Sequence, residues 1–351
     1  MNPEERKRIL AGKKKAGLFA KSPTRKPNRQ SSKKNSEENE EGQQQVPMTW
    51  QEQTVSWAKT LLGALAIVMV VNGLLIQSFV VPTESMEGEV LAGDFVFVNR
   101  FIYGGSTPQT IPFLNIPLPY LRLPGLRDPE VSDVIVFIFP GNRGESEAQN
   151  FEYYLKRCVA VSGDVVETRG GVVYLNGKRE TLPENARLPD TEDPQQIREN
   201  ASKRGLLFPE GSSYTYNDWG PMKVPGEGDV ISLKGEAEYR AWRVFIEREG
   251  HEVTQVGEIV KIDGEVVDSY TVERDYVFGI GDNRANSADS RAWGFIPVEN
   301  VVGTPLTVYW SWDPYIDSPP GHRGARSQLP ERSLGDKFGN IRWDRIFNGI
   351  D

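Results

Sequence analysis

The chain has 351 residues, of which 38% are hydrophobic and 26% charged, and its formal net charge is −8. This length allows one or two domains with a sizeable core, while the negative charge argues against nucleic acid as a partner. One Cys excludes an internal disulfide, and one Cys with two His leaves no zinc site of the usual kinds, so we expect neither a metal nor another cofactor.

The N-terminal region, residues 1–58, is polar, and its first part is strongly basic. Residues 1–34 hold twelve Lys or Arg residues against Glu4 and Glu5. A segment with few apolar residues and many charges does not bury enough surface to fold alone. We therefore expect 1–58 to form a largely disordered, solvated tail.

An uncharged apolar segment follows, and residues 60–81 read TLLGALAIVMVVNGLLIQSFVV. Its length matches the roughly 20 residues that a helix needs to cross a bilayer. Trp50 and Trp57 precede it, where aromatic anchors often lie. A cleaved signal peptide is disfavoured by the length and late start of the run, and a buried core helix is the other alternative. We interpret 59–81 as an uncleaved transmembrane helix, with the basic tail cytoplasmic and the rest of the chain outside.

Beyond the anchor the apolar residues recur with a period of two, which is typical of β-strands. Asn176-Gly177 and Asp263-Gly264 are turn pairs that favour hairpins. A helical pattern lies around 236–249. The predicted strands lie within 94–103, 132–139, 153–180, 258–272, 275–283 and 301–310.

These patterns predict a mainly β, antiparallel domain over residues 82–351, preceded by one transmembrane helix. Residues 104–130 are rich in Pro and Gly and are interpreted as a loop. Residues 181–257 are polar and mixed, and are interpreted as an inserted subdomain. Near the end, IRWDRIF at 341–347 is a possible last strand.

A serine stands where the apolar segment ends, in the stretch VVPTESMEGEV. A Ser85 nucleophile would need a base. The two histidines are poor candidates: His251 lies in the polar insertion and His322 in a Pro/Gly-rich tail, and we interpret both as ordinary surface residues. A lysine whose pKa is lowered by apolar burial is another possible base. Lys156 is the best candidate, because in a strand it shares a face with small or apolar residues. Without further context, a serine such as Ser85 is more commonly an ordinary loop residue, and a lysine such as Lys156 is more commonly solvated.

A long polar stretch between two predicted strands, GDNRANSADSRAWGFIP at 281–297, has balanced charges. Polar residues in loops commonly serve turns. The length and charge balance of this one also suit a network of hydrogen bonds and ion pairs that fixes side chains. The stretch alone leaves both interpretations open.

The order of these stretches resembles bacterial type I signal peptidases, the membrane-bound Ser/Lys proteases that remove signal peptides. The apolar anchor, VPTESM, YYLKRCVAVSGD and GDNRANSADSRAWG carry the resemblance, and the last motif is very specific. It does not cover residues 1–45 or most of 181–257. The matching stretches are about 76–103, 131–178 and 260–310.

The resemblance implies that Ser85 is the nucleophile and Lys156 the general base. It implies that Thr83 helps the Ser85 backbone N–H to form an oxyanion hole, and that Ser287 orients the lysine. The implied supporting network consists of Arg157, Asp282, Asp289 and Arg291. The residues implied to line pockets for small substrate side chains are Phe79, Val81 and Leu155.

Three residues depart from the family pattern. Glu84 stands where many relatives have Gly, Ala285 where a second Asp is common, and Cys158 where Val is more usual. None of the three changes removes a catalytic group. Glu84 alters the backbone and the electrostatics next to the nucleophile.

The resemblance further implies an endopeptidase that cuts signal peptides with small residues at −1 and −3 through an acyl-enzyme. Its expected partners are exported preproteins and the lipid bilayer, and we expect a monomer in the bacterial inner membrane with its catalytic domain on the periplasmic side. One alternative is a self-cleaving regulator, a class that normally carries a DNA-binding domain where this chain has an anchor. Another is an anchored β module without activity.

Overall fold

An exposed helix opens the described part of the chain in the computed structural model, which describes residues 49–107, 110–111, 116–117, 121–190, 207–314 and 334–350. Helix α2 (Trp50–Val70) starts at a capping box, in which the Thr49 N–H donates to Glu52 Oε2 at 2.8 Å and the Glu52 N–H to Thr49 Oγ1 at 3.3 Å. The π-helical turn η1 (Val71–Leu75) continues it. Together, residues 50–75 are long and apolar enough to span a bilayer.

The bounds predicted for this helix were wrong at both ends. The capping box starts the helix at Trp50, nine residues before the predicted start at Lys59. At the other end, Ile76–Val80 forms strand β1, because its backbone pairs with β2 and the Arg100 N–H donates to Leu75 O at 2.8 Å. Apolar composition extends across both elements, so it does not reveal where the helix stops.

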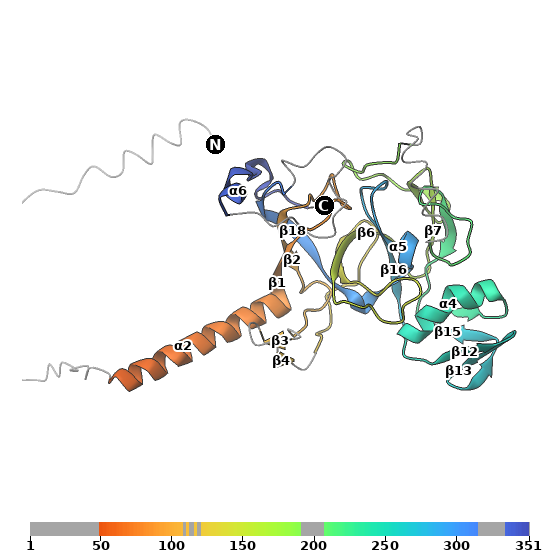
Figure 1. Ribbon diagram of the computed structural model, residues 1–351, viewed down its shortest axis with the longest axis horizontal. Helices are drawn as coiled ribbons and strands as arrows, with labels where there is room; N and C mark the ends of the chain where they lie inside the picture. Colours follow the sequence, from red (N-terminus) through yellow and green to blue (C-terminus); the bar gives the residue numbers. More distant parts are fainter. Residues whose placement is uncertain are drawn as a thin grey trace, which may run out of the picture. The chain divides into compact units, whose positions relative to one another are not determined.

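The main sheet has seven strands with antiparallel neighbours, so the predicted mainly β, antiparallel fold is confirmed (Figure 1). Its central strands come from distant parts of the sequence, which brings the predicted motifs together. In spatial order the strands are β1, β2 (Asp94–Asn99), β18 (Val301–Ser311), β5 (Val134–Ile138), β6 (Tyr153–Val161), β16 (Tyr276–Ile280) and β17 (Ile296–Pro297).

Smaller sheets and helix α4 (Glu236–Arg248) form around the predicted insertion, 181–257. Its strands pair with strands beyond its borders, because β10 joins β7, β11 joins β15 and β12 joins β13. The subdomain therefore draws on both sides of the insertion. The strands are β7 (Val165–Arg169), β8 (Val172–Leu175), β9 (Lys178–Arg179), β10 (Trp219–Lys223), β11 (Val230–Ser232), β12 (Val253–Val256), β13 (Ile259–Ile262), β14 (Glu265–Val267) and β15 (Ser269–Thr271).

The predicted last strand at 341–347 was wrong. A 3-10 turn, η3 (Trp343–Arg345), occupies the stretch. A helical turn brings two arginines to one buried carboxylate: Arg345 Nη2 lies 2.7 Å from Asp94 Oδ2, and Arg342 Nη1 lies 3.6 Å from Asp94 Oδ1. The remaining short elements are β3 (Thr110–Ile111), β4 (Ile116–Pro117), α5 (Ser290–Trp293), η2 (Val298–Asn300) and α6 (Leu334–Gly339).

One of three apolar clusters in the described residues lies directly beneath residues 81–90, which we call the serine elbow. Val81, Met86 and Val90 from the loop after β1 pack there against strands β2, β5 and β18, and Met86 is only 1% exposed. Burial of Met86 and Val90 stabilises the fold by roughly 1.5–3 kcal/mol each. The loop is therefore fixed to the core on both sides of Ser85.

Candidate active site

The serine elbow is a tight turn fixed at both ends. The Val81 N–H donates to Asp94 O at 2.8 Å, and the Val90 N–H donates to Met86 O at 2.9 Å. Between these points Met86 is buried, whereas Ser85 stays partly exposed. The neighbouring Thr83 Oγ1 lies 3.3 Å from Ser85 Oγ, so the two hydroxyls stand side by side.

Lys156 reaches the serine from the middle of strand β6, where it pairs with Ile135 of β5. Its side chain is nearly fully buried, and Nζ donates to Ser85 Oγ at 2.8 Å and to Leu155 O at 2.8 Å. Burial lowers the pKa of Lys156 to about 8, although the carboxylates of Asp289 and Asp282 act in the opposite direction. A substantial fraction of this amine is therefore neutral at mildly alkaline pH.

Two buried ion pairs lie beside the lysine. Arg157 Nη2 lies 2.8 Å from Asp282 Oδ2, and Arg157 also donates through Nη1 to Ser132 O at 2.8 Å. Arg291 Nη2 lies 2.7 Å from Asp289 Oδ2, with both side chains fully buried. Burial alone would raise the pKa of Asp289, but the Arg291 charge and its hydrogen bonds hold it below its ordinary value. The Arg157–Asp282 pair fixes the 281–291 loop against β6, whereas the Arg291–Asp289 pair lies within the loop itself.

Ser287 is buried in the same loop, next to the serine elbow. A Cβ placed on Gly281 would lie 2.2 Å from Ser287 Oγ and 2.3 Å from Ser85 O, so only glycine allows these segments to approach so closely. Ser287 Oγ makes no hydrogen bond of normal geometry to Lys156, and its interaction with the Asp289 carboxylate contributes to the lowered pKa of that group. An orienting role for Ser287 stays a prediction.

The residues expected to line substrate pockets share one apolar cluster. Val81 is buried in it, and the half-buried Phe79 and Leu155 pack against it. The rings of Phe79 and Tyr153 meet edge to face, with centroids 4.8 Å apart. The cluster also contains Met86, the residue after Ser85, so the three residues pack in the core next to the elbow, and their role in substrate pockets stays a prediction.

Asn283 is a contact residue for which the sequence analysis assigned no individual role. Its backbone N–H donates to Ser85 O at 3.1 Å, and its Nδ2 donates to Glu84 O at 3.2 Å. The carbonyl of Glu84, the residue that departs from the family pattern, thus helps to tie the two loops together. Asn283 stands within the polar 281–297 motif, so its position was a usable signal.

The other departures and His251 take ordinary positions. Cys158 is fully buried, which raises the pKa of its thiol, and Ala285 is partly exposed. His251 lies between two carboxylates, with Nδ1 2.6 Å from Asp263 Oδ2 and Nε2 3.1 Å from Glu273 Oε1. His322 lies outside the described residues.

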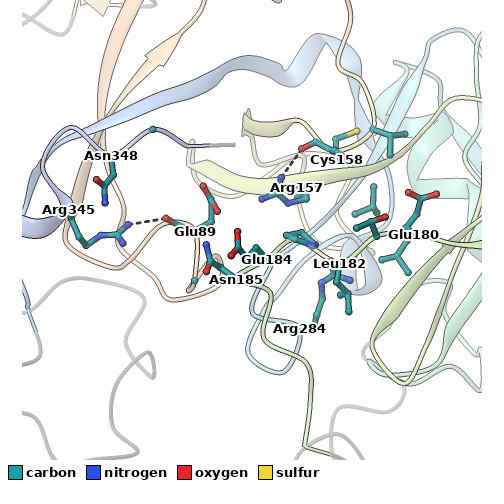
Figure 2. Close-up of a pocket in the computed structure, with 18 residues that line it drawn as sticks. Glu89, Arg157, Cys158, Glu180, Leu182, Glu184, Asn185, Arg284, Arg345 and Asn348 are labelled. Carbon is teal, nitrogen blue, oxygen red and sulfur yellow. Dashed lines mark hydrogen bonds between the residues drawn. The ribbon is translucent and has the colours of Figure 1, made fainter.

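A cavity of about 560 Å³ adjoins the network (Figure 2). It is bordered by Gly88 and Glu89 of the serine elbow, by Arg157 and Arg284, and by the segment 180–185. Arg284 is 2% exposed and donates to Gly171 O at 3.1 Å, and burial lowers its pKa to about 10. The elbow is thus packed on a core on one side and borders a polar hollow on the other.

A serine hydroxyl in contact with a buried amine, on a rigid antiparallel sheet, suits the acyl transfer of a serine peptidase. Comparison with known proteins identifies the family: the model of the signal peptidase family, peptidase S26, matches residues 54–310. The chain belongs to this family. It is a serine endopeptidase of the signal-peptide-processing kind, and its family is bacterial and membrane-associated.

Two relatives named signal peptidase I agree with this assignment. Signal peptidase I of Helicobacter pylori is 28% identical over 313 residues, which cover 87% of this chain and 96% of the relative. Signal peptidase I of Pseudomonas aeruginosa is 27% identical and covers 76% of each chain. A solved signal peptidase I structure from Enterococcus faecalis covers 51% of this chain and 97% of its own, at 20% identity and a TM-score of 0.23.

Proposed function

We propose that this protein removes signal peptides from exported preproteins with Ser85 as nucleophile and neutral Lys156 as general base. The observation that carries the proposal is the 2.8 Å contact between Lys156 Nζ and Ser85 Oγ, made by an amine whose pKa burial lowers to about 8. Once neutral, this amine has a lone pair that can accept the hydroxyl proton at the same distance.

The reaction follows the general course of acyl transfer. Lys156 takes the proton as Ser85 Oγ bonds to the scissile carbonyl carbon, and the developing oxyanion accepts hydrogen bonds from the Ser85 N–H and the Thr83 hydroxyl. Lys156 then gives the proton to the leaving amine as the C–N bond breaks. Water, deprotonated by the same amine, hydrolyses the acyl-enzyme and releases the signal peptide.

The buried ion pairs support the geometry of this proposal. Arg157 neighbours Lys156 on β6 and is held by Asp282, and the Gly281 N–H donates to Asp289 Oδ2 at 3.2 Å. These contacts fix the loop that holds Ser85 O through Asn283.

A hydrolysis assay on a preprotein with Ala at −1 and −3 separates this enzyme from an inactive anchored module, which would bind the preprotein without releasing the mature chain.

Substrates with Ala at −1 are expected to be cut roughly 10–100-fold faster than their Leu counterparts, measured as kcat/KM. Phe79, Val81 and Leu155 gather in one packed cluster beside the nucleophile, and overfilling a packed site costs roughly 1–3 kcal/mol. Leu155→Ala should enlarge the site and reduce this ratio. Equal rates on the two substrates with the native enzyme would refute the pocket assignment.

We further propose that residues 50–75 anchor the protein in the bilayer with the catalytic domain outside. The neighbouring strands β1, β2 and β18, of which β1 directly follows the anchor, support a lipid neighbour. Their side chains Val80, Phe97 and Leu306 are apolar and exposed. Phe97 also stacks on Tyr309, with ring centroids 4.1 Å apart.

An impermeant maleimide tests this orientation, since the single native cysteine, Cys158, is buried. Cysteine introduced at Gly144, an exposed position with open space around its Cα, should be labelled in intact spheroplasts. Ser31→Cys, in the basic tail, should be labelled only after lysis. The reverse pattern would invert the proposed topology.

A further inference from the structure

A short segment of the chain contacts the 281–291 loop, which we call the catalytic loop. We call residues 183–187 the strap. The Ala186 N–H donates to Pro183 O at 3.0 Å and closes a turn. Next to this turn, the Arg187 N–H donates to Asp282 O and the Arg284 N–H donates to Arg187 O, each at 2.9 Å. The strap thus adds a one-residue bridge to the loop that holds Asp282.

The side chain of Arg187 connects the strap to the serine elbow through Glu87. Arg187 Nη1 lies 2.8 Å from Glu87 Oε1, and the other oxygen, Oε2, accepts from Asn283 Nδ2 at 3.3 Å. Asn283 in turn donates its backbone N–H to Ser85 O at 3.1 Å. One carboxylate therefore joins the strap and the catalytic loop two residues from the nucleophile.

Backbone packing reinforces this link at the next residue. Gly88 has a φ of +114°, and a Cβ placed there would lie 2.1 Å from Asn185 O. The strap and the elbow are thus in direct backbone contact. A displacement of the strap toward the elbow would therefore push on the elbow backbone, because the two leave no room even for a Cβ at Gly88.

On its inner side the strap borders a hollow. The cavity of about 560 Å³ is lined there by residues 181–185, with Gly88, Glu89 and Arg284 on neighbouring walls (Figure 2). A segment that borders a hollow depends on its few discrete contacts for its position. We propose that Arg187 is a positioning residue, which holds Ser85 in its reactive geometry through Glu87 and the strap.

This inference rests on the proposed function and predicts an effect on catalysis rather than on folding. The Arg187 side chain is 57% exposed and that of Glu87 is 23% exposed. Ion pairs so accessible to water contribute little to stability. Small displacements of a nucleophile, by contrast, slow a reaction strongly, by up to about 100-fold for roughly 1 Å.

The test uses the full-length enzyme in detergent, acting on a preprotein with Ala at −1 and −3. Arg187→Ala should lower kcat about tenfold with KM within about twofold and an unchanged Tm. Arg187→Lys should recover most of the rate, since it keeps the charge beside Glu87. The double variant with the charges reversed, Arg187→Glu with Glu87→Arg, should have a higher kcat than Arg187→Glu or Glu87→Arg alone.

A matched control comes from an exposed ion pair in α4, where Arg240 Nε lies 2.6 Å from Glu236 Oε1 and the side chains are 50% and 56% exposed. Arg240→Ala should match the native enzyme in kcat, KM and Tm. A native kcat for Arg187→Ala, or a loss explained by a fall in Tm, would overturn the positioning role. Ser85→Ala in the same assay tests the proposed function separately: residual native-like cleavage there would overturn that function itself.

Discussion

Ser85→Ala and Lys156→Met are each expected to abolish preprotein processing, with a loss in kcat on the order of 10⁶ as for other units of nucleophile and base. Each side chain supplies a group that the other cannot replace, because Ser85 forms the bond and Lys156 moves the proton across 2.8 Å. The double variant should be no slower than either single one, since residues that act as a unit are non-additive.

The free energy of unfolding of Lys156→Met distinguishes a loss of catalysis from a loss of folding. Lys156 is buried, and its pKa is lowered to about 8, so the unfolded chain binds more protons than the folded one between pH 8 and its ordinary value of 10.5. Stability therefore rises with pH across that window, and the full penalty for charging the buried amine applies below pH 8. At pH 6, Lys156→Met should be more stable than the native enzyme by up to about 3 kcal/mol.

The measurements are single-turnover cleavage and denaturant unfolding of each variant. His251→Ala is the control, because this residue is held by surface carboxylates and has no part in the proposed chemistry. It should keep most of the native rate. Near-native cleavage by Lys156→Met would remove the lysine from the mechanism, and total loss in His251→Ala would point to a histidine base.

The strands were predictable because local chemistry determines them. The period-two pattern located the central strands of the main sheet, and Asn176-Gly177 marked a hairpin whose two residues have φ values of 51° and 78°, as a turn of this kind requires. The 236–249 helical pattern corresponds to α4, Glu236–Arg248. Such signals lie within a few residues, so they need no knowledge of the tertiary structure.

Element boundaries were less predictable because tertiary contacts set them. Composition alone extended the anchor to residue 81, whereas pairing with β2 turns Ile76–Val80 into a strand. Composition also favoured a strand at 341–347, whereas shared contact with Asp94 requires a turn.

The candidate site shows the same division. Residue chemistry alone left Ser85 and Lys156 ordinary, because their contact spans 71 positions of sequence and depends on strand order in the sheet. The family resemblance singled them out, and the structure places them within hydrogen-bond distance. Neither residue chemistry nor the family resemblance indicated Arg187. It lies in an irregular segment, and its contacts with Asp282, Arg284 and Glu87 all come from tertiary structure.

The pH dependence of cleavage is expected to show the titration of Lys156. Only the neutral amine can accept the Ser85 proton, so kcat/KM should rise about tenfold per pH unit below pH 8 and level off above it. This rising limb of the pH profile reports the pKa of Lys156 in the free enzyme, because kcat/KM reflects the ionisation of groups before substrate binds. The measurement is kcat/KM between pH 6 and pH 10, on a preprotein with Ala at −1 and −3.

A change near the lysine should move this limb in a known direction. The Asp282 carboxylate favours the charged amine and so raises the pKa of Lys156. Asp282→Asn removes that charge, so the limb of the folded variant should move to lower pH even if kcat falls through the loss of the contact with Arg157. Arg240→Ala, on the surface of α4, should leave the limb in place. A limb that moved to higher pH in Asp282→Asn, or a native rate that fell steadily from pH 6 to pH 9, would contradict a neutral Lys156 as the base, because an amine base loses its lone pair as pH falls.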